Sequence, residues 1–185
     1  MSESIILASS SPRRSELLKG MGIEFRIIVR PVDEHTDLPP RMAVMQLAER
    51  KARAVAGELL SGIVIGCDTL VCLEGEALGK PADEDEARNM LKRLSGKTHS
   101  VFSGICVIDA NVNKTLTGVA ETLVEFREMS DREIEDYVAT GEPMDKAGAY
   151  AIQGGAGKFV KMISGSFENV MGLPVQMLRG MLESV

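Results

Sequence analysis

The sequence predicts an α/β protein with a mixed, twisted sheet flanked by helices. Short apolar runs alternate along the chain with segments in which apolar residues recur every three or four positions, the spacing of one helix face. Two long central segments are predicted to form a hairpin, which adds antiparallel pairs to a sheet that alternation alone would make parallel. With 185 residues, 44 % of them apolar, the chain is sized for one domain over 1–185.

The chain begins with a strand–helix–strand pattern. Ser4–Ala8 is a short apolar run, and Ser11-Pro12 is typical of an N-cap followed by proline at the first helical position. Gly20 ends this helix, and Phe25–Val29 is a second strand. A long helix over Arg41–Leu60 follows, because its apolar residues lie along one stripe.

The middle of the chain contains the most apolar segment. Ile63–Leu73 is expected to be a strand that is covered on both faces. Asp83 and Glu86 are spaced as in a capping box, which predicts the start of a helix that ends at Gly96.

The remaining elements continue the alternation. Ser130 and Glu133 predict a second capping box, and the glycine-rich segment Asp145–Gly157 is expected to be mostly loop. The other predicted elements, in chain order, are the strands His99–Asp109 and Thr115–Arg127, the strand Phe159–Ile163 and the helix Pro174–Glu183.

Charge and hydropathy exclude several classes of function. The net charge of −6 argues against a general nucleic-acid binder, which carries a basic face or stripe. No segment approaches the roughly 20 apolar residues of a spanning helix. The first eleven residues lack a basic segment followed by a long apolar one, so we expect no signal peptide, no membrane partner and a cytoplasmic protein.

The sequence lacks several common catalytic patterns. Cys67, Cys72 and Cys106 lie in apolar runs and are expected to be buried and reduced. His35 and His99, the only histidines, complete no metal-ligand spacing. There is no P-loop and no Gly-x-Ser-x-Gly elbow.

The segment Ser9-Ser10-Ser11-Pro12-Arg13-Arg14 follows a strand and opens a helix. Arginines are electrostatically misplaced in a first helical turn, where the backbone N–H groups already carry partial positive charge. Hydroxyls, two guanidinium groups and free N–H donors together favour an anion, most naturally phosphate. The alternative is a serine cap with solvated arginines.

Asp68 is the second unusual residue, since a carboxylate inside an apolar strand is costly to bury unless it is paired, protonated or metal-bound. We expect it to bind Mg²⁺ or to act as a general base toward water. The alternative is a strand that ends at Cys67 and leaves Asp68 at the rim of the sheet. Glu34 lies in an acidic loop, a position that by itself only weakly indicates a functional carboxylate.

Three further polar residues have both a functional and an ordinary interpretation. Lys51 lies at the edge of an apolar helix stripe, where by itself a snorkelling lysine is the better interpretation. Lys80, in Gly79-Lys80-Pro81, is either a ligand for an anion or a solvated loop lysine. Gln153 lies between apolar residues and a glycine turn, and its amide is suited to the edge of a flat base.

These residues also occur in motifs that resemble the Maf family over nearly the whole chain. The motifs, in family order, are Ser9–Arg14, Gly66-Cys67-Asp68-Thr69, Gly79-Lys80-Pro81, Asp145–Gly154 and Asn169–Pro174. The resemblance implies a cytoplasmic nucleoside triphosphate pyrophosphatase with an ITPase-like α/β fold. Its two lobes would surround a central cleft, with Arg13 and Asp68 on the walls.

The resemblance also implies roles for individual residues. Asp68 would activate water, and Glu34 would assist it or the divalent metal, Mg²⁺ or Mn²⁺. The residues that would contact the triphosphate are Ser9, Arg14, Lys51 and Lys80. The family further implies a homodimer.

Within the family, the residues at three positions distinguish branches that prefer different substrates. Arg13, Thr69 and Gln153 match the branch that prefers dTTP and UTP, whereas Ala151 departs from the glycine of many relatives. The expected reaction is hydrolysis of these nucleotides, or of modified pyrimidine nucleotides, to the monophosphate and pyrophosphate. The alternatives are a nucleotide-binding regulator of septation without turnover and, less favoured, an interaction module that uses the C-terminal helix.

Overall fold

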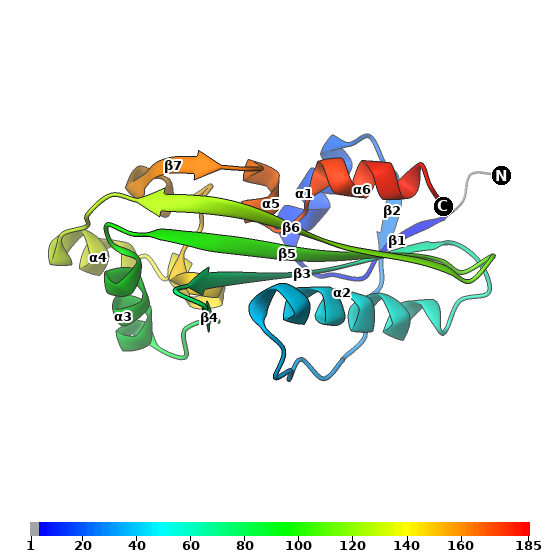
Figure 1. Cartoon of the computed structure of the whole chain (residues 1–185), viewed down its shortest axis with the longest axis horizontal. Coiled ribbons are helices and arrows are strands. Elements are labelled where there is room, and N and C mark those ends of the chain that lie inside the picture. The colour runs from blue at the N-terminus through cyan, green and yellow to red at the C-terminus, as the bar shows by residue number, and fades with distance from the viewer. Residues whose placement is uncertain (1–3) are drawn as a thin grey trace. The chain divides into compact units, whose positions relative to one another are not determined.

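The computed structural model describes residues 4–185 (Figure 1). Residues 1–3, which begin the segment considered for a signal peptide, lie outside the described residues. The strands are β1 (Ile5–Leu7), β2 (Phe25–Ile27), β3 (Ile63–Leu73), β4 (Glu76–Leu78), β5 (Thr98–Asp109), β6 (Lys114–Phe126) and β7 (Val160–Ser164). The α-helices are α1 (Pro12–Gly20), α2 (Pro40–Ala56), α3 (Glu84–Leu94), α4 (Asp131–Val138), α5 (Phe167–Met171) and α6 (Val175–Leu182).

The strands form a seven-stranded sheet, in the order β2-β1-β3-β5-β6-β7 with β4 paired to β3. β1 pairs in parallel with β2 and β3, whereas β3–β4 and β6–β7 are antiparallel. The α/β class and the mixed sheet flanked by helices are therefore confirmed.

The chain divides into two compact units. The first contains the chain up to Asp68, together with Ser103–Ala120 and Gly172–Val185. The second contains Thr69–Phe102 and Glu121–Met171. The boundaries fall inside β3, β5 and β6, so each of these long strands contributes to both units.

Both faces of the sheet are covered in the first unit. Leu7 packs with Leu18 of α1 and Leu178 of α6, while its neighbour Ile6 faces the opposite way and packs with Ala48 of α2. Figure 1 shows α2 on one side of β1 and β3, and α1 and α6 on the other. This covering on both faces explains why β1 and β3 are almost wholly apolar.

Two glycines bring α2 close to the sheet. A Cβ at Gly66 of β3 would lie 2.2 Å from the carbonyl oxygen of Ala48, and one at Gly104 of β5 would lie 2.1 Å from that of Val44. Only glycine fits at either position, because real Cβ atoms do not approach a backbone oxygen so closely. The contact at Gly66 sets the height of α2 above β3, immediately before Asp68.

The second unit is built around buried rings. Phe126 contacts Tyr150 edge-to-face, with ring centroids 4.9 Å apart, and Tyr137 of α4 contacts Phe159 at 5.6 Å. His99 joins this cluster through edge contacts with Phe126 and Tyr150. Helices α3 and α4 pack together beside it.

Local differences from the sequence expectations have identifiable causes. α2 ends at Ala56, not at Leu60, which is fully exposed and so has nothing to pack against. β2 ends at Ile27, since Ile27 and Val29 are about half exposed at this edge of the sheet. β4 and α5 are too short to give a periodic pattern. The expected loop 145–157 instead contains parts of three 3₁₀ helices: η1 (Glu142–Asp145), η2 (Ala147–Ala149) and η3 (Gly155–Phe159).

The helix caps mostly follow the sequence. The capping box of Ser130 and Glu133 is confirmed. Asp83 caps α3, but Glu86 accepts a hydrogen bond from the N–H of Ala82 and not from that of the N-cap residue. No helix within 4–185 is long and apolar enough to cross a membrane.

Candidate active site

The turn between β1 and α1 positions Ser9 at the carboxyl end of a parallel strand. The Nη1 of Arg14 donates to Ser9 Oγ at 3.0 Å, and its Nε donates to the carbonyl oxygen of Gly172 at 2.8 Å. The Ser9 hydroxyl also accepts from the Ser11 N–H at 3.3 Å. Ser11 is the N-cap residue, as predicted, but its side chain makes no capping hydrogen bond.

The first turn of α1 has the electrostatic character of an anion site. It contains no acidic residue, and it carries Arg13 and Arg14, both partly buried. The guanidinium of Arg14 is fixed at two atoms, in contrast to a solvated arginine. The backbone N–H groups at this helix end and the fixed guanidinium favour a phosphate group.

Lys51 of α2 bridges two carboxylates. Its Nζ lies 2.6 Å from Asp68 Oδ1 and 2.8 Å from Glu34 Oε1. The side chains of Lys51 and Asp68 are only 17 % and 11 % exposed, whereas that of Glu34 is 63 % exposed. The snorkelling interpretation of Lys51 is therefore wrong, because its ammonium group is directed to a buried partner.

The loop that carries Glu34 is held by the residue next to Lys51. Nη1 of Arg50 donates to the carbonyl oxygens of Asp33 and His35, at 2.9 and 2.8 Å. These bonds hold the backbone on both sides of Glu34, so neighbouring residues of α2 anchor the loop and bind its carboxylate.

Asp68 lies inside β3, not at its end. The strand continues to Leu73, so the alternative that placed Asp68 beyond the strand is wrong. β1 ends at Leu7, which pairs with Ile65, and the Ala8 N–H donates to the Ile65 carbonyl oxygen at 2.8 Å. Asp68 is thus three residues further along β3, beside the end of β1 where ligands bind in open α/β sheets.

Three charged groups of this site affect the pKa of one buried thiol. Burial raises the pKa of Cys67 to about 11, the charges of Arg14 and Lys51 oppose that rise, and the charge of Asp68 adds to it. All three charged groups are therefore near enough to influence the thiol of the residue that precedes Asp68. Cys67, Cys72 and Cys106 are buried and unbridged, as predicted.

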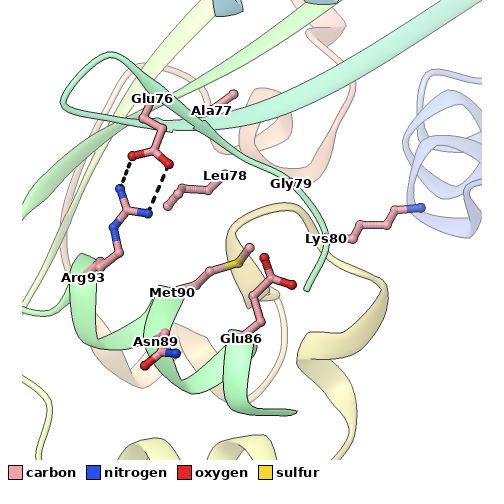
Figure 2. A pocket seen from close by; sticks show the side chains of 9 residues that line it. All are labelled: Glu76, Ala77, Leu78, Gly79, Lys80, Glu86, Asn89, Met90 and Arg93. Atoms are coloured by element: carbon pink, nitrogen blue, oxygen red, sulfur yellow. Dashed lines mark hydrogen bonds and ion pairs between the residues drawn. The ribbon is translucent and has the colours of Figure 1, made fainter. Parts of the chain in front are cut away.

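Lys80 belongs to the second unit, where it is exposed at the end of a pocket between β4 and α3. The pocket has a volume of about 190 Å³ and contains the Glu76–Arg93 ion pair. Figure 2 shows the Lys80 side chain pointing away from the other pocket residues. Its loop is anchored through Gly79, whose carbonyl oxygen accepts from the Gly148 N–H at 2.9 Å.

Gln153 also belongs to the second unit and lies in an exposed turn between η2 and η3. Ala151 and Ile152, which precede it, are 6 % exposed. Thr69 follows Asp68 in β3 and is partly buried. The roles of Lys80, Thr69 and Gln153 therefore remain predictions.

Sequence reasoning missed the Gly172 carbonyl as the partner of Arg14. Gly172 has a φ of +111°, a conformation that favours glycine. The motif Asn169–Pro174 indicated that the segment matters, but residue types do not reveal the direction of a backbone carbonyl. Within residues 4–185, no group of three or more His, Cys, Asp or Glu side chains is placed to hold a metal.

Comparison with known proteins gives a consistent result. Residues 4–185 match the sequence model of the family described as "Maf: Maf-like protein". A protein of Pelotomaculum thermopropionicum named dTTP/UTP pyrophosphatase is 51 % identical over 181 residues, which cover 97 % of this chain and 95 % of that protein. A protein of Caldicellulosiruptor bescii with the same name is 50 % identical, over 98 % of this chain and 94 % of its own length. A third of that name, from Clostridium botulinum, is 48 % identical, over 97 % and 96 %.

Proposed function

The chain is a member of the Maf family, and we propose that it hydrolyses dTTP and UTP to the nucleoside monophosphate and pyrophosphate. Relatives whose sequences are about 50 % identical to this chain over nearly the full length carry the name dTTP/UTP pyrophosphatase. The single observation that carries the mechanism is the Lys51–Asp68 pair beside the β1–α1 turn. The chain works as one pyrophosphatase domain, a proposal supported by a family match that spans both units.

The phosphate chain binds at the first turn of α1. Ser9 and Arg14 contribute a hydroxyl and a guanidinium that lie 3.0 Å apart, and the backbone N–H groups of the turn add donors. Lys51 adds an ammonium group from α2, and Lys80 adds a second from its loop. These cations stabilise the charge that develops on the leaving pyrophosphate.

Asp68 is the general base. Water attacks the α-phosphorus, the bond from that phosphorus to the bridging oxygen breaks, and pyrophosphate leaves with the electron pair. Asp68 accepts the proton that the water loses. Lys51 orients the Asp68 carboxylate by its 2.6 Å contact, and Glu34 shares the same ammonium group.

The carboxylates also fit a divalent cation. One oxygen of Asp68 and one of Glu34 contact the same Lys51 Nζ, so the two carboxylates lie close together beside it. Mg²⁺ typically takes one or two carboxylates and completes its shell with water and substrate phosphates. Asp68 and Glu34 would therefore hold Mg²⁺ or Mn²⁺, which when bound supplies charge neutralisation on the phosphates.

The base is read by Arg13, Thr69 and Gln153. The amide of Gln153 offers a donor and an acceptor, and uracil and thymine present both kinds of group along one edge. Since a methyl group changes binding by only about 1–3 kcal/mol, the 5-methyl group of thymine does not bar a site that also accepts uracil. We propose dTTP and UTP as substrates, with modified pyrimidine nucleotides as further candidates. We also propose that the protein is a cytoplasmic homodimer that binds neither nucleic acid nor membrane.

The test is to incubate the purified protein with dTTP and Mg²⁺ and to resolve the products, with the Asp68→Asn variant as control. dTMP and pyrophosphate are expected from the wild type. dTDP and orthophosphate would contradict the reaction. Tight binding of UTP without turnover would instead favour the regulator of septation.

A further inference from the structure

We propose that Tyr137 and Glu142 are positioning residues that hold the turn bearing Gln153 and so determine how well the base is selected. This inference rests on the proposed function, in which Gln153 reads the base. Within the second unit, the two side chains bind backbone N–H groups on opposite sides of Gln153, two residues before it and two residues after it.

Tyr137 holds the turn at its beginning. Its hydroxyl accepts a hydrogen bond from the Ala151 N–H at 3.0 Å, and both residues are buried. The ring is itself fixed by its edge contact with Phe159. A buried N–H that loses its acceptor is energetically costly, so the hydroxyl determines where the backbone enters the turn.

Glu142 holds the turn at its end. Its Oε2 accepts from the Gly155 N–H at 2.9 Å. A Cβ at Gly154 would lie 1.9 Å from Glu142 Oε1, so the carboxylate rests against the backbone beside Gln153. Gly154 is therefore part of the anchor, because a Cβ at this position would displace the carboxylate.

The two anchors are linked to each other. Thr140 Oγ1 donates to the Tyr137 carbonyl oxygen at 2.7 Å and accepts from the Glu142 N–H at 3.2 Å. The turn itself is closed by a hydrogen bond from the Gly154 N–H to the Ala151 carbonyl oxygen at 3.0 Å. The end of α4 and the start of η1 thus form one support for the whole turn.

Gln153 is the exposed side chain that this support presents. Ala151 and Ile152 point into the core, while the Gln153 side chain is exposed. Hydrogen-bond readout of a base depends on placement to within about half an ångström, which requires a fixed backbone beneath the amide. Loss of either anchor is expected to weaken selection of the base more than the chemical step.

The experiment measures kcat and KM for dTTP and dGTP, which share a sugar and differ in the base. Tyr137→Phe and Glu142→Ala are expected to lower the kcat/KM ratio of dTTP to dGTP about tenfold, mainly by raising KM for dTTP. Glu142→Gln keeps a carbonyl acceptor for the Gly155 N–H and is expected to retain most of the wild-type ratio. If Tyr137→Phe fails to fold, the comparison of Glu142→Ala with Glu142→Gln decides alone.

The matched control is Ser95→Ala. Ser95 Oγ accepts from the Met129 N–H at 2.7 Å, so this variant removes the same kind of bond in the same unit without affecting the turn. Its ratio is expected to stay at the wild-type value. An equal fall in Ser95→Ala would overturn the proposal, since selectivity would then follow general loosening.

Two further outcomes separate this proposal from its premise. A ratio that falls in Gln153→Glu but is unchanged in Tyr137→Phe and Glu142→Ala overturns the positioning role and leaves base reading by Gln153 intact. A ratio unchanged in Gln153→Glu overturns base reading itself, and the positioning proposal with it. Absence of pyrophosphate from the wild type would contradict the proposed function directly.

Discussion

The ammonium group of Lys51 is held between a buried carboxylate and an exposed one, 2.6 Å from Asp68 and 2.8 Å from Glu34. The buried partner lies within a strand whose other side chains are mostly apolar and buried. An unpaired carboxylate there is strongly unfavourable, so Lys51 is what allows Asp68 to stay inside the strand as an anion. The same contact places a cation where a phosphate group is expected to bind.

Removal of the Asp68 charge tests its role in catalysis. Asp68→Asn keeps the side-chain volume but cannot accept the proton from water. We expect turnover of dTTP to fall by about 100-fold or more, as is typical for loss of a general base. Thermal unfolding measured alongside should show little loss of stability, because Lys51 keeps Glu34 as its second partner. Near-normal turnover would remove Asp68 from the mechanism.

Loss of Lys51 is expected to be costly chiefly because it leaves Asp68 unpaired. Lys51→Met keeps the aliphatic stem, and we expect it to lower the free energy of unfolding by about 3 kcal/mol. The double variant Lys51→Met/Asp68→Asn should recover most of that stability, because the buried charge is then absent as well. Urea unfolding of the wild type, both single variants and the double variant measures the coupling. Additive effects would show that the contact contributes little.

The close approach of α2 to Gly66 is expected to be necessary for the site. Gly66→Ala would place a methyl group 2.2 Å from the Ala48 carbonyl oxygen, so α2 must shift. We expect a loss of about 1–3 kcal/mol of stability, with lower kcat because Lys51 moves with the helix. Gly180→Ala in α6 is the matched control, since its Cβ would meet no atom within 4 Å. Unchanged kcat in a folded Gly66→Ala protein would refute this dependence.

His99 makes stability depend on pH. Burial lowers its pKa from 6.5 to about 4, and its Nδ1 has no hydrogen-bond partner among the described residues. The unfolded chain binds a proton below pH 6.5 that the folded chain refuses until about pH 4, so stability falls as pH decreases through this window. Across the whole window, this difference in pKa lowers the free energy of unfolding by about 3 kcal/mol. Urea unfolding at several pH values measures how steeply the free energy of unfolding depends on pH. This dependence should be shallower for His99→Gln, which cannot titrate, than for the wild type. An equal dependence in both proteins would contradict the role of His99.

The elements that the sequence predicted well are those with a strong local signal. The bounds of β3 and the capping box of α4 follow from an uninterrupted apolar run and from paired polar residues at fixed spacing. β4 and α5 were missed because three and five residues carry no period. The end of α2 was placed four residues too late, since the apolar Leu59 and Leu60 continue the pattern beyond the last packed turn.

The candidate site was predictable residue by residue but not as an arrangement. Asp68 and the Ser9–Arg14 segment are unusual in their own local context, so the sequence singles them out. Lys51 is an ordinary helix-edge lysine until Gly66 lets α2 approach β3, a contact between segments far apart in the sequence. Tyr137 and Glu142 were missed for the same reason, because they act on the backbone of a turn more than ten residues away.

The position of bond cleavage tests the central claim most directly. Hydrolysis of dTTP in isotopically labelled water (H₂¹⁸O), followed by mass spectrometry of both products, shows which phosphorus the water attacks. With Asp68 as base toward water at the α-phosphorus, the label is expected in dTMP, and the pyrophosphate should remain unlabelled. Label in the pyrophosphate would place the attack at the β-phosphorus and contradict this account.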